Sequence, residues 1–174
     1  MLTTSHGDLA DAGGDLGRAA DAGPASHALP PQRFQQLPPT ELEEMREAHH
    51  AVGLELGTLL GMTTDWARTR WVAGPARGTV LPQFFVRVPG ARPDRRTGEL
   101  LTRRLTRRGW GGRLLVDADR FRIDARRRGL TLALEAYEAH EHTISLRVDG
   151  GVLAIGPTQK LHLLAGAYED DDGS

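Results

Sequence analysis

The sequence predicts an α+β fold, in which a mostly antiparallel sheet of four to six strands carries two helices packed on one face and follows a disordered N-terminal tail. An apolar stripe with helical spacing runs from Glu41 to about Met62, and a short arginine-rich helical segment ends at Gly109-Trp110. At least three segments of alternating apolar and polar residues follow. With 174 residues, the chain fits one domain that can bury a core without disulfides or metal.

Residues 1–37 form the predicted tail, because their Ala, Gly, Asp and Pro content cannot repay the entropy of ordering. A single domain is expected over 38–167, with an acidic tail over 168–174. Thr40 and Glu43 match a T-x-x-E capping box and predict the start of the first helix. The residues expected to face inward on this helix are Leu42, Met45, Ala48, His49, Val52, Leu56, Leu59 and Leu60.

Val80 to Val88 is the first predicted strand. It is apolar on both faces, which is typical of a strand covered on both sides, and Pro82 indicates an edge or a bulge near its beginning. The preceding segment, Thr63 to Ala73, fits neither a helical nor a strand pattern.

A second, shorter helix is predicted over 100–108, where an L-T-R-R unit occurs twice. On a helix, Leu101 and Leu105 point inward and the arginines share the opposite side. Gly109 is the expected C-cap. The outward arginines are Arg103, Arg104, Arg107 and Arg108.

Three alternating segments, 121–125, 130–137 and 143–148, predict an antiparallel meander with one buried and one solvated face. Val152 to Ile155 is a candidate for a fourth strand, and Leu161 to Leu164 is a candidate for the last strand. We expect the inward residues of the strands and of both helices to share one core. These are Leu101, Leu105, Phe121, Ile123, Leu132, Leu134, Ile144 and Leu146, with Leu42, Val52, Leu56 and Leu59.

This layout, from Thr40 to Val148, resembles small actinobacterial cell-envelope lipoproteins and related uncharacterised proteins. The resemblance implies an amphipathic helix and a Gly-Trp helix packed on a curved sheet, and it supplies no catalytic residues. Those proteins carry a lipid-modified cysteine, whereas this chain has no cysteine. No run approaches the roughly 18 apolar residues of a membrane span. We therefore expect a cytoplasmic protein as the sequence is written, and an envelope protein if translation starts upstream of Met1.

Positive charge concentrates in residues 92–128, which carry 13 arginines and 5 acids, within a chain of net charge −1. Such a basic band could track nucleic-acid phosphates, so phosphate or nucleic-acid binding is the alternative function. However, Asp117, Asp119 and Asp124 interrupt the arginines, and no aromatic residues interleave to stack bases. We expect a solvated face, partly paired with acids of the first helix or with Glu135.

The sequence contains only weak indications of a catalytic site or a metal site. The best metal candidates are His140 and His142, with Glu138 on the same side of an extended segment, and no third histidine is identifiably near. His49 lies within the apolar stripe and is expected to be a packing residue. Ser145 lacks a G-x-S-x-G elbow. The sequence therefore predicts no enzyme activity, no metal site and no cofactor.

Two tryptophans give the best interaction candidates. Trp66 and Trp71 are flanked by Arg68 and Arg70, and exposed Trp-Arg clusters are typical of protein interfaces. At least one of the two tryptophans is expected in the core, and Trp110 is expected to pack the second helix on the sheet. We thus predict a non-catalytic binding protein with a protein partner.

Overall fold

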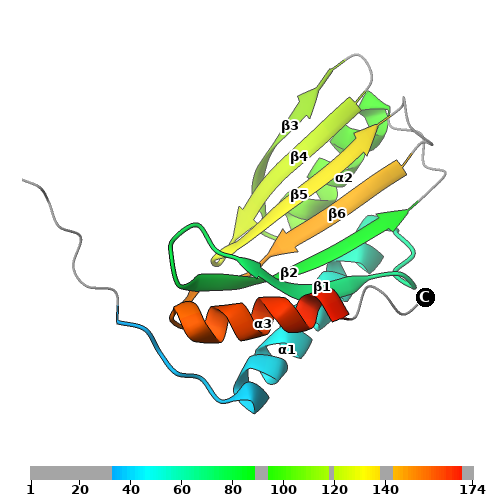
Figure 1. Ribbon diagram of the computed structural model, residues 1–174. Helices are drawn as coiled ribbons and strands as arrows, with labels where there is room; N and C mark the ends of the chain where they lie inside the picture. The colour runs from blue at the N-terminus through cyan, green and yellow to red at the C-terminus, as the bar shows by residue number, and fades with distance from the viewer. Residues whose placement is uncertain (1–32, 89–93, 118–119, 138–142, 170–174) are drawn as a thin grey trace, which may run out of the picture. The chain divides into compact units, whose positions relative to one another are not determined.

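The computed structural model describes residues 33–88, 94–117, 120–137 and 143–169. They form three helices and one antiparallel sheet, which confirms the predicted α+β class (Figure 1). The elements in chain order are α1 (Pro39–Leu60), β1 (Arg68–Ala73), β2 (Thr79–Val88), α2 (Arg95–Arg107), β3 (Gly111–Val116), β4 (Arg120–Arg127), β5 (Leu130–Tyr137), β6 (Thr143–Asp149), β7 (Leu153–Ala154) and α3 (Pro157–Glu169).

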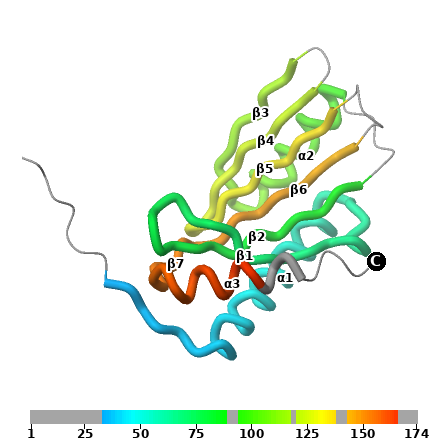
Figure 2. The backbone as a smooth tube through the Cα atoms, viewed as in Figure 1, coloured from blue at the N-terminus to red at the C-terminus, as the bar shows by residue number. Residues whose placement is uncertain are grey.

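The sheet has the strand order β1-β2-β6-β5-β4-β3 (Figure 2). Every neighbouring pair is antiparallel. The predicted meander is confirmed, since β4 pairs with β5 and β5 pairs with β6. The short strand β7 pairs with the start of β2, beyond the end of β6. This order leaves β1 and β3 at the two edges of the sheet.

Pro82 lies inside the sheet, so the predicted edge position is wrong. Its strand, β2, has β1 on one side and β6 and β7 on the other. The carbonyl of Pro82 accepts a hydrogen bond of 2.8 Å from the Gly150 amide. The missing N–H of the proline therefore faces the interruption between β6 and β7, where no ladder bond is lost. The irregularity that the proline requires is in its neighbour strand.

The main core lies between one face of the sheet and helices α1 and α2. Phe84, Ile123 and Leu134 are fully buried there, at 0% exposure. Gly53 lets α1 approach β2 closely, because a Cβ atom at this position would lie 2.1 Å from ring carbons of Phe84. The residues predicted for the core all belong to this cluster except Leu42.

Helix α3 replaces the predicted last strand at 161–164, which is a correction. Pro157 is its first residue, a position where the fixed φ of proline and its missing N–H suit a helix. Leu163 and Leu164 pack on a second, smaller cluster around Trp71. Leu42 belongs to this second cluster and not to the main core, because the first turns of α1 extend past the main core. Ala48, expected to face inward, is exposed.

The start of α1 also differs from the prediction. Pro38 occupies the N-cap position, no side chain caps the helix, and Glu43 is engaged by Arg46 instead of completing a capping box with Thr40. Proline at N1 sets the helical φ without a polar cap. Residues 33–37, assigned to the tail, contact the domain, since the Gln35 amide donates to the carbonyl of Ala154 over 2.7 Å. The rest of the predicted tail lies outside the described residues.

Strand β3 has no counterpart among the strands expected from the sequence. Its residues, Gly-Gly-Arg-Leu-Leu-Val, do not alternate between apolar and polar, and pairing with β4 makes the segment a strand. The helix before it ends as expected, since Leu101 and Leu105 are buried and Gly109, just after the C-cap residue Arg108, has φ of 80°. Trp110 is buried at 3% exposure, as predicted.

Candidate functional site

A groove of about 1240 Å³ lies beside the β1 edge of the sheet. The outer side of α1 forms one wall, and β1 with the neighbouring part of β2 forms the other. Glu43 and Glu47 line the helix wall, whereas Arg68, Arg70 and Arg87 line the strand wall. The groove therefore carries opposite charges on its two sides.

The two tryptophans next to this groove have different environments. Trp66 is 79% exposed, the highest value among the large apolar side chains in the described part of the chain. Trp71 is 6% exposed and packs with Val80 and Ile155 in the second cluster, as expected for at least one of the two tryptophans. The alternation of β1 turns Arg68 and Arg70 outward and Trp71 inward, whereas Trp66 lies in the turn before the strand.

Helix α1 covers part of the free edge of β1. The Arg46 guanidinium donates a 3.2 Å hydrogen bond to the carbonyl of Thr69, and His50 Nδ1 lies 2.9 Å from the Thr69 hydroxyl. Arg46 also donates through Nε to Glu43 over 2.9 Å. This hydrogen bond lowers the pKa of Glu43 below its usual value, more than desolvation raises it. The groove floor is thus held by polar contacts between α1 and β1.

Phe85 is a residue of the groove that the sequence analysis missed. The strand was expected to be covered on both faces, but only the Phe84 side is covered, and Phe85 is 42% exposed. The register pairs Phe85 with Arg68, so an aromatic ring and an arginine of neighbouring strands lie on the same open face. Only the pairing of β1 with β2 brings Phe85 close to Trp66 and Arg68, which precede it by 19 and 17 residues.

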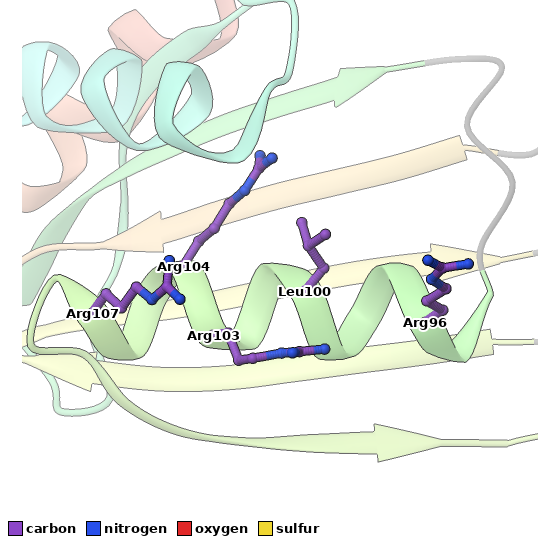
Figure 3. Close-up of a pocket in the computed structure, with 5 residues that line it drawn as sticks. All are labelled: Arg96, Leu100, Arg103, Arg104 and Arg107. Carbon is purple, nitrogen blue, oxygen red and sulfur yellow. The ribbon is translucent and has the colours of Figure 1, made fainter.

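The predicted basic band appears on the outer side of α2. Arg103, Arg104, Arg107 and Arg108 are all exposed, as expected, and a shallow hollow of about 370 Å³ lies among several of them (Figure 3). Arg104 extends toward the end of α1, where its Nη1 donates to the carbonyl of Leu59 over 3.4 Å. Glu99 is the only acid of this helix.

Three other arginines of the band, Arg113, Arg120 and Arg122, lie on the open face of the sheet, among acids. Arg122 makes ion pairs with Asp124 at 2.7 Å and with Glu135 at 2.8 Å, which confirms the predicted pairing with Glu135. Hydrogen bonding to Asp124 raises the pKa of Arg122, and bonding to Asp117 raises the pKa of Arg120. Because these charges are matched within the chain, they offer less attraction to an external anion than the α2 arginines do.

Histidines and metal ligands give no site in the described part of the chain. The candidates Glu138, His140 and His142 lie outside the described residues. His49 is buried and its Nε2 lies 2.9 Å from the carbonyl of Val148, so it packs as predicted. No group of three His, Asp or Glu side chains suited to a metal ion occurs among the residues that the structure describes.

Comparisons with protein-family models, curated proteins and solved structures found no match to this chain. None of the helices within the described ranges combines the length and the apolar character needed to cross a membrane.

Proposed function

We propose that this chain is a non-catalytic binding protein whose groove beside β1 takes an extended, acidic segment of a partner protein. The observation that carries the proposal is the 79% exposure of Trp66 at a groove lined by arginines. Tryptophan and arginine are the side chains that most often dominate binding energy at protein interfaces. A large exposed indole gains more from burial by a partner than any other side chain could.

Charge and shape support this class of partner. The strand wall offers Arg68, Arg70 and Arg87, whose planar guanidinium groups suit carboxylates. Trp66 and Phe85 offer apolar contact beside them. A segment that alternates acidic and apolar residues, as an extended chain does, would satisfy both kinds of contact.

The helix wall adds a constraint on the partner. Glu43 and Glu47 repel a segment that carries acids on both sides, so they favour one in which acids face β1 and β2 only. Arg46 neutralises Glu43 in part, which leaves Glu47 as the stronger selective charge.

The test starts with selection of peptides on the full chain from a random display library. We expect enriched peptides to combine acidic residues with an aromatic or aliphatic one. Trp66→Ala should raise the Kd of a labelled selected peptide more than about tenfold, as expected for a tryptophan hot spot. Arg87→Glu should have an effect of the same direction.

Leu161→Ala is the matched control, because Leu161 is 69% exposed on α3 and does not line the groove. It should leave the Kd unchanged. Peptides without acidic enrichment, or full binding by the Trp66→Ala variant, would reject the groove as the binding site.

The alternative function is phosphate or nucleic-acid binding by the outer side of α2. The five exposed arginines of this helix, with the single acid Glu99, favour it. Fluorescence anisotropy with mixed-sequence oligonucleotides near physiological salt should show at most weak binding that declines as salt rises. Salt-resistant, sequence-dependent binding below about 10⁻⁷ M that is lost in Arg103→Glu/Arg107→Glu would put this alternative first.

An association with the cell envelope is a further part of the proposal. It rests on the layout resemblance and requires an apolar signal segment ending in a cysteine upstream of Met1. The in-frame DNA upstream of Met1 and fractionation of cells expressing the native locus test it. An in-frame stop just before Met1, with protein only in the soluble fraction, would remove this part and leave the groove proposal intact.

A further inference from the structure

Strand β3 is the edge of the sheet opposite to β1, and no described element pairs with its outer side (Figures 1 and 2). Its side chains are unusually apolar for an uncovered edge, since Leu115 is 44% exposed and Val116 is 42% exposed. Sheet edges with unpaired backbone groups and exposed apolar residues pair readily with a strand of another chain.

The backbone of β3 shows which groups point outward. The Asp117 amide donates to the carbonyl of Arg120 over 2.9 Å, so the backbone groups of Asp117 face β4. Along an antiparallel strand, the backbone N–H and C=O groups of successive residues point alternately to the two sides of the strand. The backbone groups of Arg113 and Leu115 therefore also face β4. The N–H and C=O groups of Leu114 and Val116 consequently point away from the sheet.

The side chains of the same strand are self-complementary. Leu114 packs against the main core, so the side chains of Arg113, Leu115 and Asp117 lie on the open face. In chain order they are positive, apolar and negative. A two-fold related copy presents the reverse order, which places each arginine opposite an aspartate. Opposite charges directly across antiparallel strands are stabilising.

We propose that β3 is a homodimerisation edge, at which a second copy of this chain pairs antiparallel about a two-fold axis at Leu115. In this register Leu114 of each copy exchanges backbone hydrogen bonds with Val116 of the other copy. Leu115 meets its own counterpart, and Arg113 meets Asp117 of the second copy on both sides of the axis. The two sheets then continue into one.

Arg113 and Asp117, which would pair across the dimer, already form ion pairs within one chain. Asp117 is already 2.8 Å from Arg120, and Arg113 is 3.8 Å from Asp124. All four side chains lie on the open face, so the new pairs join a row of alternating charges and bury no unpaired charge.

The first experiment measures molar mass of the full chain by sedimentation equilibrium over a wide concentration range. The wild type should move toward twice its 19.0 kDa mass as concentration rises. The Arg113→Asp variant carries aspartate at both 113 and 117, and the Asp117→Arg variant carries arginine at both. Like charges would then lie opposite each other in the dimer, so each variant alone should stay monomeric. An equal mixture of the two should dimerise, because every aspartate then meets an arginine.

Arg96→Asp is the control, since it makes the same change of charge on the exposed side of α2, away from β3. It should dimerise like the wild type. A wild type that stays monomeric at every concentration, or a mixture of variants that stays monomeric while the wild type dimerises, would overturn the proposal.

The second experiment tests the register with single cysteines, since the chain has none of its own. Leu115→Cys should form a disulfide-linked dimer under mild oxidation, because directly opposed residues of a non-hydrogen-bonded pair have Cα atoms about 4.5 Å apart. Val116→Cys is the matched variant. Its two copies lie two residues out of register, beyond the roughly 7 Å limit for bridging. Cross-linking by Val116→Cys and not by Leu115→Cys would overturn the proposed axis.

Discussion

The two edges of the sheet are built differently, although both edge strands have six residues. At β1, Arg46 of α1 occupies the carbonyl of Thr69, His50 contacts its hydroxyl, and α3 packs against the strand. At β3, α2 lies over the inner face, and among the described residues no arginine of α2 makes a hydrogen bond or an ion pair with the strand. Polar side chains of a helix cover part of one edge, whereas no described element pairs with the backbone groups of the other.

This difference shows how one sheet can hold two kinds of binding surface. Where α1 occupies the edge of β1, strand addition is hindered, so recognition there depends on side chains such as Trp66 and Phe85 lining a groove. An uncovered edge recognises a strand through its backbone, and its side chains decide only which strand. The following predictions test whether α1 and its contacts produce the difference.

The largest effect is expected when the contact between α1 and β2 is removed. Phe84→Ala should reduce the free energy of unfolding by about 3 to 5 kcal/mol, because the ring is fully buried beneath α1. Phe85→Ala is the matched control on the same strand, exposed on the other face, and should cost well under half as much. Urea denaturation of both variants measures the two losses in the free energy of unfolding. Equal losses would show that the two faces of β2 are not buried as described.

An added side chain at the closest approach of α1 should have the next largest effect. Gly53→Ala places a Cβ atom 2.1 Å from the Phe84 ring, which must move, so we expect a loss of about 1 to 3 kcal/mol by overpacking. Gly151→Ala is the control, since nothing lies within 4 Å of its Cβ position. Thermal unfolding compares the two. A stable Gly53→Ala protein would mean that α1 lies farther from the sheet.

Removing the hydroxyl that His50 contacts should weaken the covered edge. Thr69→Val keeps the volume but leaves His50 Nδ1 without its partner, and we expect a loss of about 0.5 to 1.5 kcal/mol. Hydrogen exchange at the amides of β1 should also become faster. Thr131→Val, at an exposed position on β5, provides the comparison and should leave these exchange rates unchanged.

The smallest effect concerns the pH dependence of the hydrogen bond between Arg46 and Glu43 on α1. The pKa of Glu43 is lowered by its hydrogen bond with Arg46, so the associated stability is present above the unfolded pKa and is lost as the pH falls through the folded one. Arg46→Gln should return the pKa of Glu43 toward its usual value in an NMR titration. Asp94, whose pKa is lowered by the Thr97 amide, should titrate unchanged. A Glu43 pKa that does not respond would contradict the Arg46 contact.

Local periodicity along the chain predicts much of the fold. The meander of β4, β5 and β6 follows from strict alternation, and the inward positions of Leu101 and Leu105 follow from helical spacing. The core residues could be predicted for the same reason. A short segment without a clear period could not be assigned in this way, as β3 and the stretch that forms α3 demonstrate.

The candidate site was less accessible to sequence reasoning. Trp66, Arg68 and Arg70 could be named as an interaction cluster because they are close in the chain. Sequence reasoning could not predict which of the two tryptophans is buried or that Phe85 is exposed, because each depends on which helix covers which face of the paired strands.

By itself the sequence determined the α+β class, the meander and the inward face of each strongly periodic element, since these depend on the spacing of apolar residues along one segment. Only the tertiary structure decided the strand order, the helical state of residues 157–169 and the different environments of the two sheet edges, β1 and β3. These features depend on contacts between residues far apart in the chain, such as Arg46 with Thr69 and Leu163 with the Trp71 cluster. Such contacts form only when distant segments are packed together, and no local pattern encodes which segments will meet.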